Sequence, residues 1–161
     1  MFDPTSLYAS YQITISDELI DVMGHMNVMS YIQIFDIATK RFFSTFGITE
    51  EYVRNTNMGS FALEQHIRFL HEVRLGQQIT VYTRVLARSD KAIHFIHFMM
   101  RDHDNTLAAT SELVGAYANL TDRRTAPFPP QIAEKIDQYL VSHNKLDWDP
   151  LVCGVMGVNN K

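Results

Sequence analysis

The chain has 161 residues, 46% of them hydrophobic, which is enough for one well-buried core and too few for two ordinary domains. Its formal net charge is -4 and its acidic and basic residues are interleaved, so neither a nucleic acid nor an anionic membrane surface is an expected partner. The single cysteine, Cys153, excludes an intrachain disulfide framework, and residues 1–12 lack the charged-then-apolar pattern of a secretory signal, so a cytoplasmic location is expected.

The predicted elements begin with a short strand at residues 10–16, where apolar and polar side chains alternate. A polar loop at residues 21–27 follows it. From Val28 onward, apolar residues recur at three- and four-residue steps and also fill much of the remaining circumference. A helix of this kind, with Asn27 as its N-cap and Gly47 after its end, must be covered on most sides, so we expect it at the centre of the fold.

Four long strands are predicted after a capped helical turn at residues 49–58. Apolar and polar residues alternate along much of their length, and short polar turns separate them. The four segments are residues 60–73, 78–88, 92–102 and 106–120. Because each turn is tight, these strands are expected to pair in chain order as an antiparallel meander.

The chain then passes through a proline-rich segment at residues 123–130 and forms an amphipathic surface helix at residues 131–141. The last segment is irregular but too apolar to be freely solvated, so it is expected to pack on the domain or on a neighbouring subunit. We therefore predict one domain over residues 1–143 and a tail over residues 144–161. The order of elements favours an α+β fold in which a curved, five-stranded antiparallel sheet wraps around one long helix.

The candidate chemistry lies in the loop ahead of the central helix. Asp21 precedes a helix N-terminus, whose positive dipole end and unpaired amides favour an ionised carboxylate that can attack a carbonyl or orient a water. The Val28 amide can hold a developing oxyanion, and His25 can donate to the substrate carbonyl or to the leaving group. Gly24 allows a close approach of a ligand or a positive φ, and Asn27 can cap the helix or bond to the Asp21 side chain. The same residue types are also the commonest in ordinary turns and caps, so spacing alone leaves both interpretations open.

Several charged side chains outside the loop are weaker candidates. Glu64 lies in an otherwise apolar predicted strand, so its carboxylate faces either the solvent or the cleft beside Asp21. Arg88 and Lys91 near a hairpin, and Arg123 after the last strand, can bind phosphate groups. For each of these three, an ordinary solvated charge is the commoner role.

The seven histidines do not form a ligand set in the sequence. His94 and His97 are an odd number of residues apart on a predicted strand and therefore face opposite sides, as do His66 and His71. Because no ligands cluster, we expect no metal site.

The run Asp-x-x-Gly-His-x-Asn-x-x-x-Tyr at residues 21–31 resembles the loop of hotdog-fold acyl-CoA thioesterases of the 4-hydroxybenzoyl-CoA thioesterase type. The resemblance covers most of the chain. It includes the strand with Glu64, the exit at residues 124–129, and the turn at residues 76–79, where this chain has Gly-Gln in place of the usual Gly-Asp. It implies a hotdog fold and hydrolysis of an acyl-CoA thioester, with CoA as part of the substrate and no other cofactor.

The same resemblance implies a homodimer, often assembled into a homotetramer, with active sites between subunits. Asp21 falls on the family's catalytic carboxylate and Val28 on its oxyanion site, and His25 and Glu64 are further catalytic candidates. The expected substrate-binding residues are Gly24, Asn27, Tyr31, Arg88, Lys91 and Arg123.

The segments EQHIRFLHEVRLG, ATSEL and RRTAPFP most resemble thioesterases associated with carnitine breakdown, which act on betainyl-CoA. A quaternary ammonium acyl group requires an aromatic cage or a nearby carboxylate. The available side chains of these types are Tyr31, Phe35, Tyr117, Trp148 and Glu64.

Two mechanisms and two other functions stay open at this point. Asp21 either attacks the thioester carbonyl, giving a mixed anhydride, or positions a water for the same attack, and a firmly ionised Asp21 favours the first route. A hotdog hydratase or dehydratase is one alternative, although the loop lacks the proline that accompanies the Asp and His of such enzymes. A non-catalytic acyl-CoA-binding module is the other.

Overall fold

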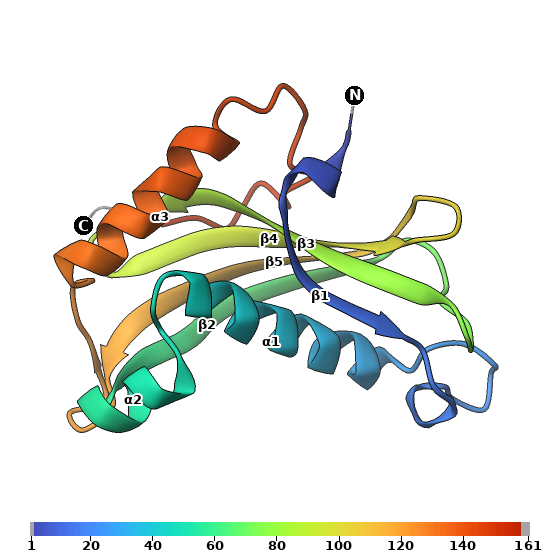
Figure 1. The fold of residues 1–161 in the computed structure, drawn as a ribbon, viewed down its shortest axis with the longest axis horizontal. Coiled ribbons are helices and arrows are strands. Elements are labelled where there is room, and N and C mark those ends of the chain that lie inside the picture. Colours follow the sequence, from blue (N-terminus) through green and yellow to red (C-terminus); the bar gives the residue numbers. More distant parts are fainter. Residues whose placement is uncertain (1, 159–161) are drawn as a thin grey trace.

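The computed structural model describes residues 2–158, which form one curled sheet with a long helix along one side (Figure 1). The strands are β1 (Tyr8–Thr14), β2 (Met58–Phe69), β3 (Gln78–Arg88), β4 (Ala92–Arg101), β5 (Thr106–Asn119) and β6 (Arg124–Thr125). The α-helices are α1 (Val28–Thr45), α2 (Glu50–Thr56) and α3 (Pro130–His143). We call the side of the sheet that faces α1 the inner face and the opposite side the outer face. This arrangement confirms the predicted α+β architecture.

The sheet is not the simple meander that the turns predicted. Its strand order is β1-β3-β4-β5-β2, with β6 paired to β5, and every pair is antiparallel. Of the four predicted long strands, only β3, β4 and β5 pair in chain order, because β2 pairs with β5. Residues 70–77 carry the chain across, first bonding to Ala108 of β5 and then to Ile15 beside β1. A turn signal shows that the chain reverses but not which strand becomes its neighbour. The sixth strand, β6, lies in the proline-rich segment at residues 123–130, for which no strand was predicted.

The central helix begins where expected. The Asn27 side chain accepts a hydrogen bond from the Met29 amide at 2.8 Å. The buried side of α1 includes Tyr31, Ile34, Phe35, Ala38, Phe42 and Phe43. However, α1 is not covered on most sides, since Asp36 and Lys40 are exposed. The hydrophobic pattern did not reveal the uncovered side because Met29, which is 67% exposed, is apolar as well.

α3 closes the sheet at the β3 edge, beside the end of α1, and the tail covers part of the outer face. α3 packs against the second half of β3, where β1 no longer pairs, and the His143 ring accepts a hydrogen bond from the Val85 amide at 2.9 Å. Farther along, Trp148 packs on Phe98 and lies under the Arg84 guanidinium, 4.4 Å from its ring centroid. The tail around Trp148 therefore lies against its own domain. None of the helices within residues 2–158 is long and apolar enough to cross a membrane.

Candidate active site

The loop ahead of α1 forms a small hairpin. Residues Ile20 and Met26 pair as an isolated antiparallel bridge, and the Asp21 amide donates to the His25 carbonyl at 3.0 Å. The Gly24 amide donates back to the Asp21 carbonyl at 3.0 Å and closes the turn. Gly24 has a φ of 81°, a backbone conformation that glycine adopts without strain. Of the two roles considered for Gly24, the structure shows the one in the turn.

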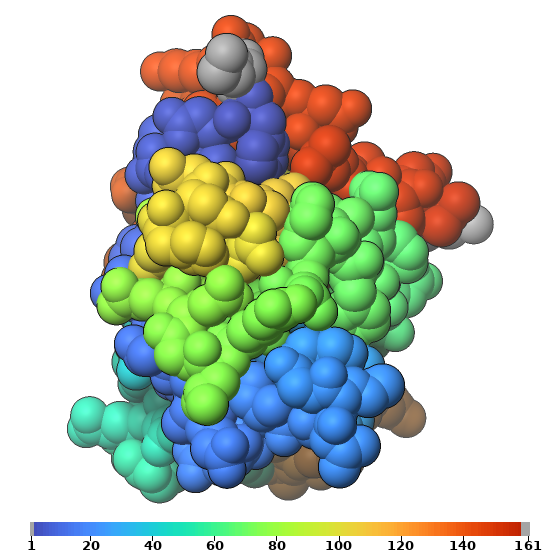
Figure 2. Space-filling model, turned by 90° about the vertical axis from the view of Figure 1, so that its right-hand side faces the viewer, coloured from blue at the N-terminus to red at the C-terminus, as the bar shows by residue number. Residues whose placement is uncertain are grey.

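The hairpin is also attached to the rest of the domain. The Met26 amide donates to the Val73 carbonyl at 2.7 Å, and the Asn27 amide donates to the Leu19 carbonyl at 2.9 Å. Figure 2 looks at this end of the molecule and shows the blue loop against the green segment that contains Val73. Because the backbone is held on both sides, the side chains of the hairpin keep a defined position relative to α1.

The Asp21 carboxylate is partly buried and only partly engaged. Its side chain is 16% exposed, and that of the neighbouring His25 is 33% exposed. Oδ1 of Asp21 accepts a hydrogen bond from the Met23 amide at 2.8 Å, whereas Oδ2 lies 3.7 Å from Nδ1 of His25. The amide that Asp21 binds thus belongs to the loop and not to α1. Oδ2 has only this long contact among residues 2–158, so it is accessible to a substrate.

The first amides of α1 differ in availability. The Met29 amide donates to the Asn27 side chain. The Val28 amide, by contrast, donates no hydrogen bond among residues 2–158. Val28 is 53% exposed. A helix N-terminus with a free amide is suited to an anion or a developing oxyanion. The oxyanion role of Val28 stays a prediction that this geometry allows.

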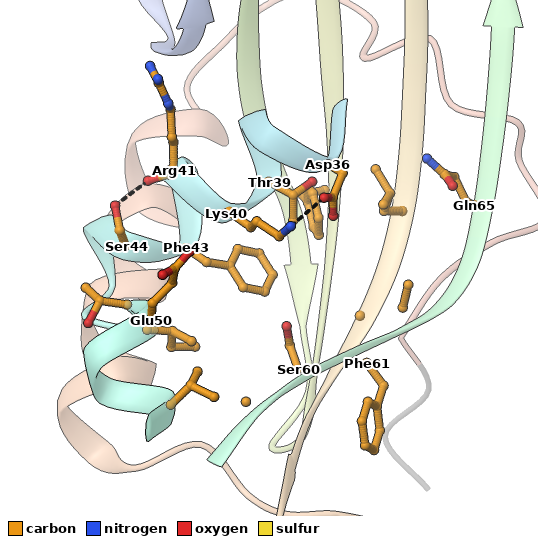
Figure 3. Close-up of a pocket in the computed structure, with 18 of the residues that line it drawn as sticks. Asp36, Thr39, Lys40, Arg41, Phe43, Ser44, Glu50, Ser60, Phe61 and Gln65 are labelled. Atoms are coloured by element: carbon orange, nitrogen blue, oxygen red, sulfur yellow. Dashed lines mark hydrogen bonds and ion pairs between the residues drawn. The ribbon is translucent and has the colours of Figure 1, made fainter. Parts of the chain in front are cut away.

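A cavity of about 850 Å³ lies between the second half of α1, α2 and strands β2 and β5 (Figure 3). Phe43 and Phe95 form apolar parts of its wall. Its charged rim includes Asp36, which pairs with Lys40 at 2.6 Å, and Glu50 of α2. A pocket of this size, mostly apolar with a few polar groups, is typical of small-molecule sites.

The cavity and the Asp21 loop lie at different ends of α1. None of the residues 20–28 lines the cavity. Asp36 follows Val28 by about 12 Å along the helix axis, at 1.5 Å per residue. Sequence analysis missed this cavity. The signal for it was the pair Asp36 and Lys40, one helical turn apart on an otherwise apolar helix, which marks a side of α1 that the sheet does not cover.

Glu64 lies on the outer face of the sheet. The strand register places it opposite Val114, which in turn pairs with His94, whose side chain bonds to Glu112 on the outer face. Glu64 is exposed and does not line the cavity. Of the two orientations considered, the protomer therefore shows the solvent-facing one, and the catalytic role of Glu64 stays a prediction.

The three basic candidates have different surroundings. Arg88 forms a two-pronged pair with the Asp137 carboxylate of α3, at 2.6 and 2.5 Å, which gives it a structural role, and its phosphate-binding role stays a prediction. Arg123 lies over the Phe61 ring at 5.0 Å in the turn after β5, and Lys91 is exposed at the β3–β4 hairpin. Arg123 and Lys91 stay candidates for binding phosphate.

The four aromatic side chains available for a cage do not form one among residues 2–158. Each of the four aromatic side chains is at most 8% exposed. Tyr31 and Phe35 pack under the first half of α1, Tyr117 packs under the second half, and Trp148 lies on the outer face. Tyr31 contacts the edge of the Phe69 ring, with 5.1 Å between centroids. Tyr31 therefore positions the start of α1 and offers little surface to a substrate.

Solved structures define the class of fold. A Staphylococcus aureus protein in complex with CoA matches with a TM-score of 0.83 and 26% identity, covering 92% of this chain and 94% of that chain. A putative thioesterase from Pseudomonas putida matches with a TM-score of 0.79 and 24% identity, covering 95% of this chain and 97% of that chain. The sheet curled around α1 is thus the hotdog fold, as predicted.

Sequence comparisons define the family. The profile of the thioesterase-like superfamily matches residues 14–136. A betainyl-CoA thioesterase from Pseudomonas aeruginosa is 25% identical over 154 residues, which are 96% of this chain and 97% of that protein. An L-carnitine dehydrogenase/betainyl-CoA thioesterase from Agrobacterium fabrum is 30% identical over 118 residues, 73% of this chain but 24% of that longer protein. The chain belongs to the thioesterase-like superfamily, and its enzymatic class is acyl-CoA thioesterase.

Proposed function

We propose that the protein hydrolyses a small acyl-CoA to the free acid and CoA, and that Asp21 acts on the thioester carbonyl. The observation that carries this proposal is the partly buried Asp21 carboxylate, with an accessible oxygen, in a fixed hairpin that leads directly into α1 and its free Val28 amide. Acyl transfer needs a nucleophile or base together with an oxyanion donor, and the loop holds both types of group. The cytoplasmic location stays an expectation from the sequence.

Two routes use the same accessible oxygen. In the first, Oδ2 of Asp21 attacks the carbonyl carbon while the Val28 amide donates to the carbonyl oxygen. The carbon–sulfur bond then breaks, CoA leaves as the thiolate, and water hydrolyses the mixed anhydride to restore the carboxylate. In the second, Asp21 accepts a proton from a water that attacks the same carbon. In either route, we propose His25, whose Nδ1 lies 3.7 Å from Oδ2 of Asp21, as the group that protonates the departing thiolate.

The open edge of β2 supports a homodimer. β2 has 12 residues, pairs with β5 on one side, and has no strand on its other side among residues 2–158. Leu63 and Phe69 on this strand are 55% and 50% exposed. A long, partly apolar edge is a natural template for pairing with a second chain. We therefore propose that two copies pair along β2. A homotetramer would need a further surface.

Pairing along β2 would bring the loop to the cavity. When a two-fold axis relates two antiparallel strands, the Phe69 end of one β2 lies beside the Met58 end of the other. Phe69 contacts Tyr31 near the start of α1, whereas Gly59 and Ser60 line the cavity. The Asp21 loop of one protomer would thus face the cavity of its partner, and the two halves that one chain keeps apart would form one site.

The size of the cavity favours a substrate with a compact acyl group. We propose betainyl-CoA as the substrate to test first. The Pseudomonas aeruginosa relative is named a betainyl-CoA thioesterase, and it aligns over 96% of this chain. Asp36 and the Phe43 ring are side chains that attract a quaternary ammonium group. Because Lys40 already pairs with Asp36, that ion pair must open before Asp36 can face a cationic substrate.

The substrate is tested by measuring free thiol release from betainyl-, acetyl-, benzoyl- and long-chain acyl-CoA. We expect turnover, with the highest kcat/KM for betainyl-CoA. A preference for a long fatty chain would contradict the small acyl group. Binding of all four without release of CoA would contradict hydrolysis itself, and product analysis would separate hydration from binding alone.

The shared site is tested by mixing two inactive variants. Asp21→Asn removes the carboxylate, and Asp36→Trp fills the cavity from an exposed position on α1. If each site uses the loop of one chain and the cavity of the other, half of a statistically mixed population is heterodimer with one intact site of two. Activity should then return to about a quarter of wild type, since closed two-fold dimers pair identical surfaces. No recovery on mixing, with subunit exchange verified, would place both halves in one chain.

A further inference from the structure

Four potential metal ligands meet on the outer face of the sheet, away from the Asp21 loop and the cavity. His66 of β2 lies directly opposite Glu112 of β5, His94 of β4 bonds to Glu112, and Cys153 reaches Glu112 from the tail. A ring nitrogen of His66, a carboxylate oxygen of Glu112 and Sγ of Cys153 lie within 4.8 Å of one another. We propose that these three residues bind a zinc ion and that His94 holds the Glu112 carboxylate in position.

The ligand types and their spacing suit zinc. Zinc is bound by imidazole, thiolate and carboxylate at about 2.0–2.3 Å, so ligand atoms in a tetrahedral site are about 3.3–3.8 Å apart. Shifts of about 1 Å would bring the three atoms to that spacing. The shifts can come from the edge strand and the tail, while Glu112 stays fixed. A thiolate and an imidazole do not suit calcium or magnesium, and three protein ligands leave the fourth position to water.

The Glu112 carboxylate is held ready for a cation. The residue is 1% exposed, and a buried carboxylate must have compensating partners. Nε2 of His94 lies 2.8 Å from one oxygen, and the Cys153 amide donates to the other at 2.6 Å. Burial by itself raises the pKa of Glu112, but the bonds from Cys153 and His94 outweigh it and lower the pKa, which favours the ionised form that binds metal.

The same contacts could serve only to anchor the tail, but an anchor does not explain the two other ligands. The tail is held through the Cys153 backbone amide, so the anchor does not need Sγ. The His66 side chain makes no hydrogen bond among residues 2–158, yet a ring nitrogen lies near both the carboxylate and the sulfur. Pairing of two chains along β2 would use backbone groups and leave the His66 side chain on the outer face.

The experiment uses the full chain, freed of metal with a chelator, reduced and returned to chelator-free buffer. Titration with Co²⁺ should give one ion per protomer and a sulfur-to-cobalt charge-transfer band. Because Cys153 is the only cysteine, such a band can come only from its thiolate. Zn²⁺ should displace Co²⁺ and should slow alkylation of the thiol. One-to-one binding without a thiolate band, or no stoichiometric binding, would overturn the proposal.

Variants separate the metal site from the tail anchor. Cys153→Ser keeps the amide bond to Glu112 but should abolish the charge-transfer band. Cys153→Ser and His66→Gln should each weaken Zn²⁺ binding at least about 100-fold, and His94→Gln about 10–100-fold. His103→Gln removes an exposed histidine that also has a carboxylate neighbour, Asp104 at 3.5 Å, and should leave binding unchanged. Equal affinity of wild type, Cys153→Ser and His66→Gln, with equal thermal stability in chelator, would place the ion elsewhere.

Discussion

Two of the carboxylate–histidine pairs in this molecule differ in exposure, in separation and in where their residues lie along the chain. Asp21 and His25 share one hairpin, their side chains are 16% and 33% exposed, and their nearest polar atoms are 3.7 Å apart. Glu112 and His94 come from neighbouring strands, their side chains are 2% and 9% exposed, and the contact is 2.8 Å. Both oxygens of Glu112 have close partners, whereas Oδ2 of Asp21 does not.

The difference teaches that geometry, not residue type, assigns the role of such a pair. A carboxylate can attack a carbonyl or orient a water only if one oxygen reaches the substrate. A buried carboxylate with satisfied oxygens instead stabilises the segments that it joins, and its loss leaves unpaired partners. We therefore expect changes at Asp21 to affect the rate and changes at Glu112 to affect stability.

The largest effect should come from Asp21→Asn. The amide oxygen of Asn can still accept from the Met23 amide, so the hairpin should persist, but the nucleophile or base is lost. We expect kcat/KM to fall about 10³-fold or more, which is about 4 kcal/mol of transition-state stabilisation. Thiol release measures the rate, and CD melting measures the fold. Asp17→Asn, at an exposed position in the same approach to α1, is the matched control. A near-normal rate for Asp21→Asn would remove Asp21 from the mechanism.

Two buried histidines, His97 and His143, have no acidic partner among residues 2–158. They should make the free energy of unfolding depend on pH. His97 lies between the hydroxyls of Thr83 and Thr39, at 2.8 and 2.9 Å, and burial lowers its pKa from 6.5 to about 3. Burial, and then the charge of Arg84, lower the pKa of His143 to about 4. Because the unfolded chain takes up these protons first, stability is full above pH 6.5 and falls as the pH drops below it.

The expected loss between pH 6.5 and pH 5 is about 2 kcal/mol for each of these histidines. Urea unfolding at pH 7 and pH 5 measures it, above the range in which most carboxylates titrate. His143→Gln should remove about half of the pH dependence. A free energy of unfolding that is flat over this range would mean that neither ring is kept neutral by the fold.

Glu112→Gln tests the other pair. The amide oxygen of Gln can still accept from Cys153, but the charge opposite His94 is lost, so we expect unfolding to cost about 1–3 kcal/mol less. Asp104→Asn removes a more exposed partner of Arg101 and should cost about 1 kcal/mol or less. Urea unfolding in chelator measures both variants. If folded Glu112→Gln lost as much kcat as Asp21→Asn, the expectation that Glu112 affects only stability would be wrong.

The parts of this fold that sequence predicted are local ones. The start of α1 at Val28 with its Asn27 cap, and the bounds of the strand at residues 78–88, depend on neighbouring residues and are confirmed. The hairpin position of Asp21 follows from the same local pattern. The Gly24 turn could likewise be expected, because its positive φ favours glycine.

The parts that sequence missed depend on partners far along the chain. β2 pairs with β5 and not with the strand that follows it. Arg88 pairs with Asp137, 49 residues away, so its charge was not free as the local pattern suggested. The outer-face cluster combines two strands and the tail with Glu112, while parity along a single strand compared only histidines in the same segment. Contacts between residues far apart in the sequence can be predicted only after the strand order is known.

The smallest effect should come from His25→Gln. If His25 assists the departing thiolate, its loss removes a helper and not the attacking group. A thiol has an ordinary pKa of about 8.5, so its thiolate leaves without full protonation, and we expect kcat to fall only about tenfold, or about 1.4 kcal/mol. KM should stay near wild type. A loss as large as that of Asp21→Asn would show that the pair acts as one catalytic unit in spite of its 3.7 Å separation.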